Sequence, residues 1–283
     1  MAGILYVVAT PIGNLEDVTL RALRILREVS VIAAEDTRRT ARLLQHYSIS
    51  TRTTSLHAHN EREKTPQLIG RLQAGESIAL VSDAGTPLIS DPGQTLVAAA
   101  RESGIRIESI PGPSAVMAAL SSSGLKTGEF VFLEFPPTRS KDRTSWFAAL
   151  ASQTRLAVFF EAPHRIRRTL SDMAIVLGGD REIGIGRELT KSHEESVVQP
   201  ITRHLSYFVE PKGEFTLLVP PRGTALAGHR PPPELVELRR QFGELTNNNA
   251  LSRRQALKLL AERHGLAVNE LYKSFQDDDR NGQ

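Results

Sequence analysis

Continuous apolar runs alternate with helical patterns over the first 110 residues. The run ILYVVA at residues 4–9 ends in Thr-Pro-Ile-Gly-Asn, which is typical of a buried parallel strand that leads into a loop. The same pattern predicts strands at 31–36, 77–82 and 105–110, and helices at 19–29, 37–47, 62–74 and 94–103. Because strands and helices alternate, we expect an α/β lobe with a mostly parallel sheet.

A second set of elements follows the segment IPGPSAVMAALSSSG. It comprises strands at 130–135, 156–160, 182–188 and 214–219, and helices at 145–152 and 165–177, which predicts a second α/β lobe. A Pro/Gly-rich stretch and two or three helices come next, with a helix-turn-helix pattern over 251–275. The predicted domains are an N-terminal lobe at 1–113, a C-terminal lobe at 114–220, a linker at 221–233 and an all-α module at 234–283.

The composition fits two lobes and a reducing compartment. A chain of 283 residues exceeds what one hydrophobic core usually holds, and an apolar fraction of 40% is enough for sizeable cores. The absence of cysteine excludes disulfides, a thiolate nucleophile and a sulfur-ligated zinc site. No apolar stretch approaches the roughly 20 residues that span a bilayer, and no basic region precedes the N-terminal run. We therefore expect a cytoplasmic protein without a membrane segment.

Positive charge is concentrated in one part of the chain. The formal net charge is only +3, but residues 138–170 hold seven Lys/Arg against two acids. Such a concentration is where a polyanion would dock. The segment after His229 is almost balanced, with nine Lys/Arg against eight acids, which argues against a groove-reading module there.

Three loops at strand ends are candidates for ligand binding. They are TPIGN at 10–14, SDAGTPLISDPG at 82–93 and IPGPSAV at 110–116. Ligands of open α/β sheets bind outside the carboxyl ends of the strands, so three such loops predict one crevice. Each loop alone is equally well read as a tight turn with a capping side chain. Neither a dinucleotide fingerprint nor a P-loop is present, which disfavours a dehydrogenase or an NTPase.

Seven motifs together resemble the tetrapyrrole-methylase family of S-adenosylmethionine methyltransferases. They are LYVVATPIGNLEDVT, AAEDTRRT, LVSDAGTPLISDPG, IPGPSAV, FFEAPHR, RELTKSHEE and KGEFTLLV, and they cover residues 4–219. The combination of AEDTRRT, SDAGTPLISDPG and RELTK is similar to one branch, which methylates the 2′-oxygen of a cytidine ribose in 16S ribosomal RNA of the small subunit. Two stretches depart from that branch, at 132–143 and at 193–201.

The resemblance implies two α/β lobes with S-adenosylmethionine in the cleft between them, and a homodimer. It also implies cofactor contacts, largely through main chain, at Pro11, Gly85, Thr86, Pro87, Ile89, Ser114, Ala115, Glu161 and Ala162.

Candidate catalytic and RNA-binding residues complete the predicted site. A ribose hydroxyl is a poor nucleophile, so a base or a group that stabilises the alkoxide should lie near it, and the in-line displacement needs no metal. The candidates are Glu161, His164, Glu188 and Lys191, each of which could instead be a structural ion pair or a capping residue. The expected RNA contacts are Arg38, Arg39, Arg139, Lys141, Arg143 and Arg165, with Trp146 available to stack on a base.

The sequence thus favours an enzyme that methylates a cytidine ribose of small-subunit ribosomal RNA, with the 30S particle as partner. One alternative is a methylase of the same fold that acts on a tetrapyrrole or corrin precursor, which would need fewer exposed arginines. Another is a non-catalytic nucleic-acid-binding regulator built on the C-terminal helices. The three ligand-type loops argue against the regulator.

Overall fold

The computed structural model describes residues 2–209, 211–222, 235–248 and 252–264. The chain forms two compact units, a larger one within 1–123 and 129–220, and a smaller one within 124–128 and 221–283. No helix in the described ranges is both long enough and apolar enough to cross a bilayer.

The first lobe contains a five-stranded parallel sheet. Its strands are β1 (Ile4–Val8), β2 (Val31–Ala34), β3 (Thr53–Ser55), β4 (Ile78–Val81) and β5 (Arg106–Ile110). Their order is β3-β2-β4-β1-β5, and every neighbouring pair is parallel. The mostly parallel sheet predicted for this lobe is therefore confirmed, and β3 is an edge strand that the apolar pattern does not predict.

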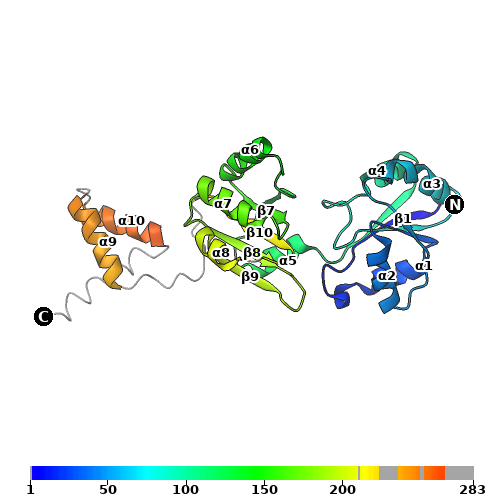
Figure 1. Cartoon of the computed structure of the whole chain (residues 1–283), viewed down its shortest axis with the longest axis horizontal. Coiled ribbons are helices and arrows are strands. Elements are labelled where there is room, and N and C mark those ends of the chain that lie inside the picture. Colours follow the sequence, from blue (N-terminus) through cyan, green and yellow to red (C-terminus); the bar gives the residue numbers. More distant parts are fainter. Residues whose placement is uncertain (1, 210, 223–234, 249–251, 265–283) are drawn as a thin grey trace. The chain divides into compact units, whose positions relative to one another are not determined.

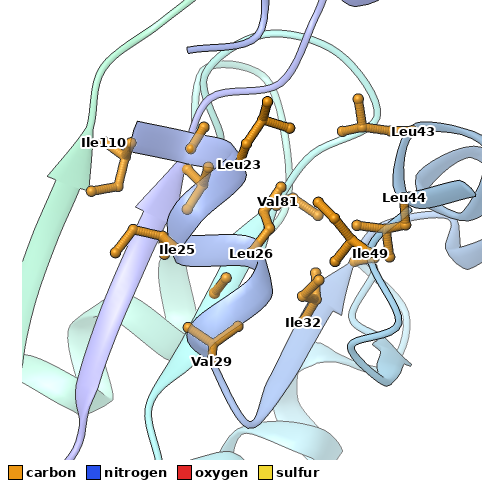
Figure 2. Close-up of a cluster of buried hydrophobic side chains, with 14 residues drawn as sticks. Leu23, Ile25, Leu26, Val29, Ile32, Leu43, Leu44, Ile49, Val81 and Ile110 are labelled. Atoms are coloured by element: carbon orange, nitrogen blue, oxygen red, sulfur yellow. The ribbon is translucent and has the colours of Figure 1, made fainter. Parts of the chain in front are cut away.

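Helices cover both faces of this sheet (Figure 1). They are α1 (Leu20–Glu28), α2 (Thr37–His46), α3 (Glu61–Gln73) and α4 (Gln94–Glu102). Buried side chains of α1 and α2 pack on one face, around Val8, Ile32 and Val81 (Figure 2). Those of α3 and α4 pack on the other face, around Leu5 and Leu80. Neighbouring strand residues thus face opposite clusters, which explains the continuous apolar runs.

The second lobe contains a five-stranded mixed sheet. Its strands are β6 (Phe130–Phe132), β7 (Leu156–Glu161), β8 (Glu182–Arg187), β9 (Glu195–Pro200) and β10 (Phe215–Val219), in the order β6-β7-β10-β8-β9. Only the β6–β7 pair is parallel. The helices of this lobe are α5 (Ala115–Ser122), α6 (Ser140–Ala151), α7 (Ile166–Leu177) and α8 (Ile201–Tyr207). Side chains of α6, α7 and α8 form one buried cluster with the sheet, and α5 contacts β10.

Several predicted boundaries in the second lobe are wrong. The strand expected at 130–135 ends at Phe132, and Glu134 has a left-handed φ of 53° that is incompatible with a continuing strand. Helix α6 begins at residue 140 rather than 145, because its first turns are polar and carry no apolar stripe, although Arg143 within them is buried. The departure at 193–201 predicts a reshaped loop, but the stretch forms β9, whose half-exposed residues lack the apolar run of a buried strand.

A buried histidine leads to a pH prediction for the second lobe. His204 is fully buried, with its ring nitrogens 3.2 Å from the Ile183 carbonyl oxygen and from Gln199 Nε2. Burial lowers the pKa of His204 to about 4. Between that value and an unfolded pKa of about 6.5, the unfolded chain binds the extra proton, so acid favours unfolding. We expect the free energy of unfolding to fall by roughly 3 kcal/mol between pH 7 and pH 4 because of this group.

The measurement is urea unfolding followed by the fluorescence of Trp146, the single tryptophan, which packs in the same lobe. In the variant His204→Gln, the free energy of unfolding should lose most of this pH dependence. All other titrating groups are the same in the two proteins, so their contributions cancel when the two pH slopes are subtracted. An identical pH slope in the two proteins would contradict the prediction.

The smaller unit contains two described helices, α9 (Leu235–Asn248) and α10 (Arg253–His264). They share a cluster around Leu238, Leu245, Leu257 and Leu260. Ser252 precedes α10, and its main-chain N–H donates to Gln255 Oε1 at 3.0 Å, a capping box that bears out the predicted helix start. The second helix of the predicted helix-turn-helix, which opens at 267–269, and most of the predicted linker lie outside the described residues.

Candidate active site

A cavity of about 450 Å³ lies beside the carboxyl ends of the first sheet. The first lobe contributes residues from the loops after β1, β2 and β4, and the second lobe contributes the N-terminus of α5 and the ends of β7 and β10 that face it. The volume is in the range of small-molecule sites. Apolar side chains line part of the wall, namely Ile12, Ile89, Val116, Phe135, Phe160 and Leu189.

The three predicted loops meet at this cavity because parallel strands end at the same edge of a sheet. The N–H of Gly85 donates to the Thr10 carbonyl at 3.0 Å, and the N–H of Thr10 donates to the Gly85 carbonyl at 2.9 Å. The Thr86 hydroxyl donates to the Pro113 carbonyl at 3.4 Å. The loops after β1, β4 and β5 are thus hydrogen-bonded to one another, and their predicted convergence is confirmed.

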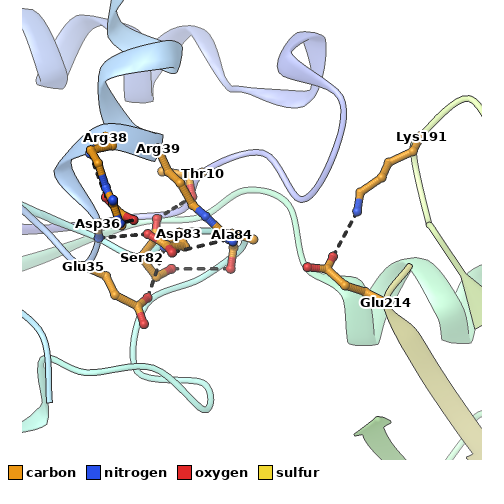
Figure 3. A network of polar contacts seen from close by, with 10 residues as sticks. All are labelled: Thr10, Glu35, Asp36, Arg38, Arg39, Ser82, Asp83, Ala84, Lys191 and Glu214. Atoms are coloured by element: carbon orange, nitrogen blue, oxygen red, sulfur yellow. Dashed lines mark hydrogen bonds and ion pairs between the residues drawn. The ribbon is translucent and has the colours of Figure 1, made fainter. Parts of the chain in front are cut away.

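Acidic side chains line the first-lobe wall. Glu35 follows β2, while Asp83 and Asp91 belong to the loop after β4. The Asp83 N–H donates to Glu35 Oε2 at 3.3 Å, and Asp83 Oδ1 accepts the Asp36 N–H at 2.9 Å. Arg39 Nη1 lies 3.4 Å from Asp83 Oδ2 (Figure 3). Burial raises the pKa of Glu35, and burial together with the charges of Glu35 and Asp83 raises the pKa of Asp91 to about 6.

The RELTK loop of the second lobe packs on the TPIGN loop of the first. Thr190 Oγ1 accepts the Asn14 N–H at 3.2 Å. A Cβ at Gly13 would lie 2.4 Å from Lys191 Cγ, so only glycine leaves room for the lysine stem there. Lys191 Nζ is 2.8 Å from Glu188 Oε1. It is also 3.1 Å from Glu214 Oε2, and Figure 3 shows this second pair.

The charges of this second-lobe cluster are fixed by its ion pairs. Burial opposes the charge of Lys191, but its hydrogen bonds to Glu188 and Glu214 outweigh this and raise the pKa of Lys191. Burial likewise acts to raise the pKa of Glu188, and its bonds to Lys191 and to the Glu214 N–H lower it on balance. Lys191 therefore stays protonated near neutral pH and is poorly suited to accept a proton.

Glu161, at the end of β7, is held in a buried network. Its side chain is fully buried, Oε1 accepts the Ala162 N–H at 2.9 Å, and Oε1 lies 3.2 Å from Arg165 Nε. The Thr169 hydroxyl donates to Oε2, and Arg143 Nη2 donates to that hydroxyl at 2.6 Å. The network fixes the cavity wall at 161–162 and leaves the Glu161 carboxylate no room for a substrate proton.

The predicted site residues divide into those that line the cavity and those that do not. Lining residues from the predicted cofactor set are Gly85, Thr86, Ile89, Ser114, Ala115, Glu161 and Ala162, whereas Pro11 and Pro87 only adjoin lining residues. Among the predicted catalytic residues only Glu161 lines the cavity. His164 is exposed, and Glu188 and Lys191 do not line the cavity themselves but contact the lining residue Glu214.

The expected RNA contacts include two arginines that turn inward. Arg143 is buried, with Nε 2.6 Å from Asp172 Oδ2, and Arg165 pairs with Glu161 and donates to the Pro136 carbonyl. Both side chains donate hydrogen bonds to carbonyl groups of the 133–139 loop. The prediction that Arg143 contacts RNA is therefore wrong, and the guanidinium of Arg165 is already used in contacts within the protein. Trp146 packs edge-on against Phe159 at 5.0 Å between ring centroids, which removes it as a stacking platform.

Other members of the expected RNA-binding set are exposed: Arg38, Arg39, Arg139 and Lys141. Arg38 Nη2 pairs with Asp36 Oδ2 at 2.8 Å, and the hydrogen bonds from Arg38 lower the pKa of Asp36 to about 2. Arg39 also lines the cavity.

The acids of the first-lobe wall are functional candidates that sequence reasoning misses. In the sequence, Asp83 and Asp91 resemble helix caps, and Glu214 is one residue of the KGEFTLLV motif. The available signal is their position: two aspartates within one loop directly after a buried strand, and Glu35 after the neighbouring strand. Among the described residues, no group of three or more His, Asp or Glu is arranged to hold a metal ion.

The structure has two α/β lobes with a cavity at their strand ends, and a family model identifies the class of this fold as methyltransferases. The model for Tetrapyrrole (Corrin/Porphyrin) Methylases matches residues 4–203. The chain therefore belongs to this family, as the motifs predicted.

Curated relatives cover almost the whole chain. A Vibrio cholerae protein named ribosomal RNA small subunit methyltransferase I is 47% identical over 276 residues, which is 96% of this chain and 94% of that protein. Proteins of the same name from Synechocystis and Escherichia coli O157:H7 are 47% and 43% identical over 96% of this chain, and they are covered to 96% and 94%.

Solved structures share the fold of the two lobes at low sequence identity. A diphthine synthase has a TM-score of 0.64 at 16% identity, covering 79% of this chain and 92% of its own. The methyltransferase CobJ has a TM-score of 0.62 at 18% identity, covering 80% and 98%. A uroporphyrin-III C-methyltransferase from Thermus thermophilus, solved with S-adenosylhomocysteine, has a TM-score of 0.56 at 18% identity, covering 77% and 97%. The predicted two-lobed tetrapyrrole-methylase fold is confirmed.

Proposed function

We propose that this protein transfers a methyl group from S-adenosylmethionine to the 2′-oxygen of a cytidine ribose in 16S ribosomal RNA. The observation that carries the proposal is the cavity of about 450 Å³, where main chain from three strand-end loops meets an acidic wall. The names of the curated relatives support ribosomal RNA as the methyl acceptor. The cytidine and its 2′-oxygen rest on the AEDTRRT, SDAGTPLISDPG and RELTK motifs.

The lining of the cavity fits S-adenosylmethionine. Ile12, Ile89 and Val116 offer an apolar surface for a purine, and the N-terminus of α5 offers main-chain N–H groups for a carboxylate. The carboxylates of Glu35 and Asp83 on the first-lobe wall favour a cation, which suits a sulfonium and an ammonium group. A relative in fold with bound S-adenosylhomocysteine supports the same ligand class.

In the proposed reaction, S-adenosylmethionine supplies an electrophilic methyl group when bound. The loops after β1, β4 and β5 hold and orient the reactants, and most of the acceleration comes from this alignment in a site that excludes water. The Arg165–Glu161–Thr169 network keeps the opposite wall rigid. Because the wall is acidic, phosphates of the RNA would bind outside the cavity, on exposed basic side chains such as Arg139 and Lys141.

The test is transfer of tritiated methyl groups from S-adenosylmethionine to purified 30S subunits that lack the modification. We expect label in the RNA of the particle and less label in free 16S RNA. Binding of S-adenosylmethionine without RNA labelling would instead favour a small-molecule methylase of this family. No binding of S-adenosylmethionine would favour the regulator.

A prediction concerns the exposed cations of α6 and the residue before it. The double variant Arg139→Ala/Lys141→Ala should weaken binding to 30S subunits about tenfold at low salt, because each side chain can neutralise a phosphate. The slope of log affinity against log salt should fall by about one to two, while affinity for S-adenosylmethionine stays the same. The matched control is Arg24→Ala/Arg106→Ala, which removes two exposed arginines of the first lobe. Equal loss in both double variants would refute the assignment.

A homodimer, which the family resemblance implies, and a cytoplasmic location, which the cysteine-free composition predicts, complete the proposal. Light scattering of the full chain at micromolar concentration would test the oligomeric state. A dimer mass is the expected result, and a monomer mass would remove that part of the proposal.

A further inference from the structure

The acids that line the cavity differ in how many of their carboxylate oxygens already have a hydrogen-bond or ion-pair partner. Both oxygens of Asp83 have partners, the Asp36 N–H at 2.9 Å and Arg39 Nη1 at 3.4 Å. Glu35 Oε2 accepts the Asp83 N–H at 3.3 Å. These bonds tie Asp83, and in part Glu35, to the loops that carry them.

The acids of the second-lobe wall are paired with cations. Glu161 is fully buried against Arg165, and Glu214 lies 3.1 Å from Lys191 Nζ. A carboxylate that already forms an ion pair is a weaker proton acceptor, because protonation would break the pair. Neither acid is therefore suited to deprotonate a hydroxyl.

Asp91 lies on the first-lobe wall and differs from the others. It lines the cavity, and within the described part of the chain no Lys or Arg forms an ion pair with its carboxylate. The end of its loop is fixed from outside the cavity, because Glu61 Oε1 accepts the Gly93 N–H at 3.1 Å. The loop that carries Asp91 is thus fixed at its end, and the Asp91 carboxylate keeps the capacity to accept a proton from the cavity.

We propose that Asp91 is the general base of the methyl transfer and accepts the proton of the acceptor hydroxyl. This inference rests on the proposed function. The ribose 2′-oxygen forms the new bond to the methyl carbon, and the carbon–sulfur bond breaks with its electron pair on sulfur, which becomes a neutral thioether. The hydroxyl proton moves to the Asp91 carboxylate and then to water, so charge and atoms balance.

The surroundings make Asp91 a stronger base than an ordinary aspartate. Burial and the charges of Glu35 and Asp83 raise the pKa of Asp91 to about 6, while the Ser82 hydroxyl opposes the shift. Arg39, on the same wall, forms an ion pair with Asp83 rather than with Asp91. Across the cavity, Arg165 pairs with Glu161 and Lys191 pairs with Glu214. The rate should therefore rise as pH increases through about 6 and level off above it, because only the carboxylate accepts a proton.

The experiment compares the full-length wild type with Asp91→Asn in single turnover on 30S subunits from pH 5 to pH 9. We expect Asp91→Asn to lower the rate constant at pH 8 about a hundredfold and to abolish the rise near pH 6. Its Kd for S-adenosylmethionine, measured by calorimetry, should stay within threefold of wild type. The surface variant Glu28→Gln, on an exposed side chain of α1, serves as the control for loss of a carboxylate.

A second variant keeps the test independent of folding effects at position 91. Glu35→Gln retains an acceptor for the Asp83 N–H but removes a charge that raises the pKa of Asp91, so the rise in rate should move to lower pH. The inference is overturned if Asp91→Asn keeps the wild-type rate and pH profile, or if its only defect is in binding S-adenosylmethionine. A wild type that labels no RNA would instead overturn the proposed function itself.

Discussion

Replacement of Gly85 by valine should raise the Kd for S-adenosylmethionine at least a hundredfold, about 2.7 kcal/mol. Gly85 has a φ of 81°, which a β-branched residue adopts only with strain. A Cβ there would lie 3.4 Å from Ile12 Cγ2 and 3.6 Å from the Pro113 carbonyl oxygen, so the branched side chain would enter the point where the three loops meet. The substitution would therefore fill cavity volume and separate the loops.

The matched control for Gly85→Val is Gly104→Val. Gly104 has a similar φ of 67°, but a Cβ there meets nothing within 4 Å, and the residue lies after α4 and away from the cavity lining. Calorimetry with S-adenosylmethionine and S-adenosylhomocysteine should find normal affinity in Gly104→Val. Affinities of the two variants within threefold of each other would mean that backbone strain, and not the cavity, determines binding.

Replacement of Glu61 by alanine should lower the free energy of unfolding by about 3 kcal/mol. Glu61 begins α3, yet its carboxylate caps another helix: Oε1 accepts the N–H groups of Gly93, Thr95 and Leu96 at 3.1, 2.7 and 3.3 Å. Helix α4 has Gly93 at its N-cap and no capping side chain of its own. Loss of the carboxylate leaves buried N–H groups without an acceptor, and a charged acceptor also stabilises the positive end of the helix dipole.

Urea unfolding followed by circular dichroism would measure this effect. Glu61→Gln keeps an acceptor oxygen and should cost about 1 kcal/mol, and Glu63→Ala, an exposed acid of the same helix turn, should cost less than about 0.5 kcal/mol. Because Glu61 also fixes the loop that carries Asp91, affinity for S-adenosylmethionine should fall several-fold in Glu61→Ala. A stability for Glu61→Ala equal to that of Glu63→Ala would contradict the prediction.

Elements with strong periodicity could be predicted from the sequence. The buried strands around Leu5, Ile32 and Leu80 are continuous apolar runs, and the capping side chains Thr19 and Asp36 stand where α1 and α2 begin. Strands β3 and β9 were not predicted, because they lie at sheet edges and are only half-buried, and their sequences therefore contain no apolar run. Position in the sheet, rather than composition, stabilises such strands.

The candidate site was predictable as loops but not as individual side chains. The convergence of TPIGN, SDAGTPLISDPG and IPGPSAV follows from parallel topology. Whether a basic side chain faces solvent or the protein interior does not follow from its neighbours in sequence. Lys141 and Arg143 are two residues apart on α6, yet Lys141 is exposed and Arg143 is buried against Asp172. Likewise, only the long-range contacts separate the engaged Asp83 from Asp91.

The position of the transferred methyl group tests the proposed 2′-O-methylation most sharply. After transfer of labelled methyl groups to 30S subunits, the RNA is hydrolysed in alkali and the products are identified by mass spectrometry. A 2′-O-methyl group blocks cleavage of the adjoining phosphodiester, so we expect label in an alkali-resistant dinucleotide that begins with methylated cytidine. Label on a base, label on another nucleoside, or no label in the RNA would contradict it.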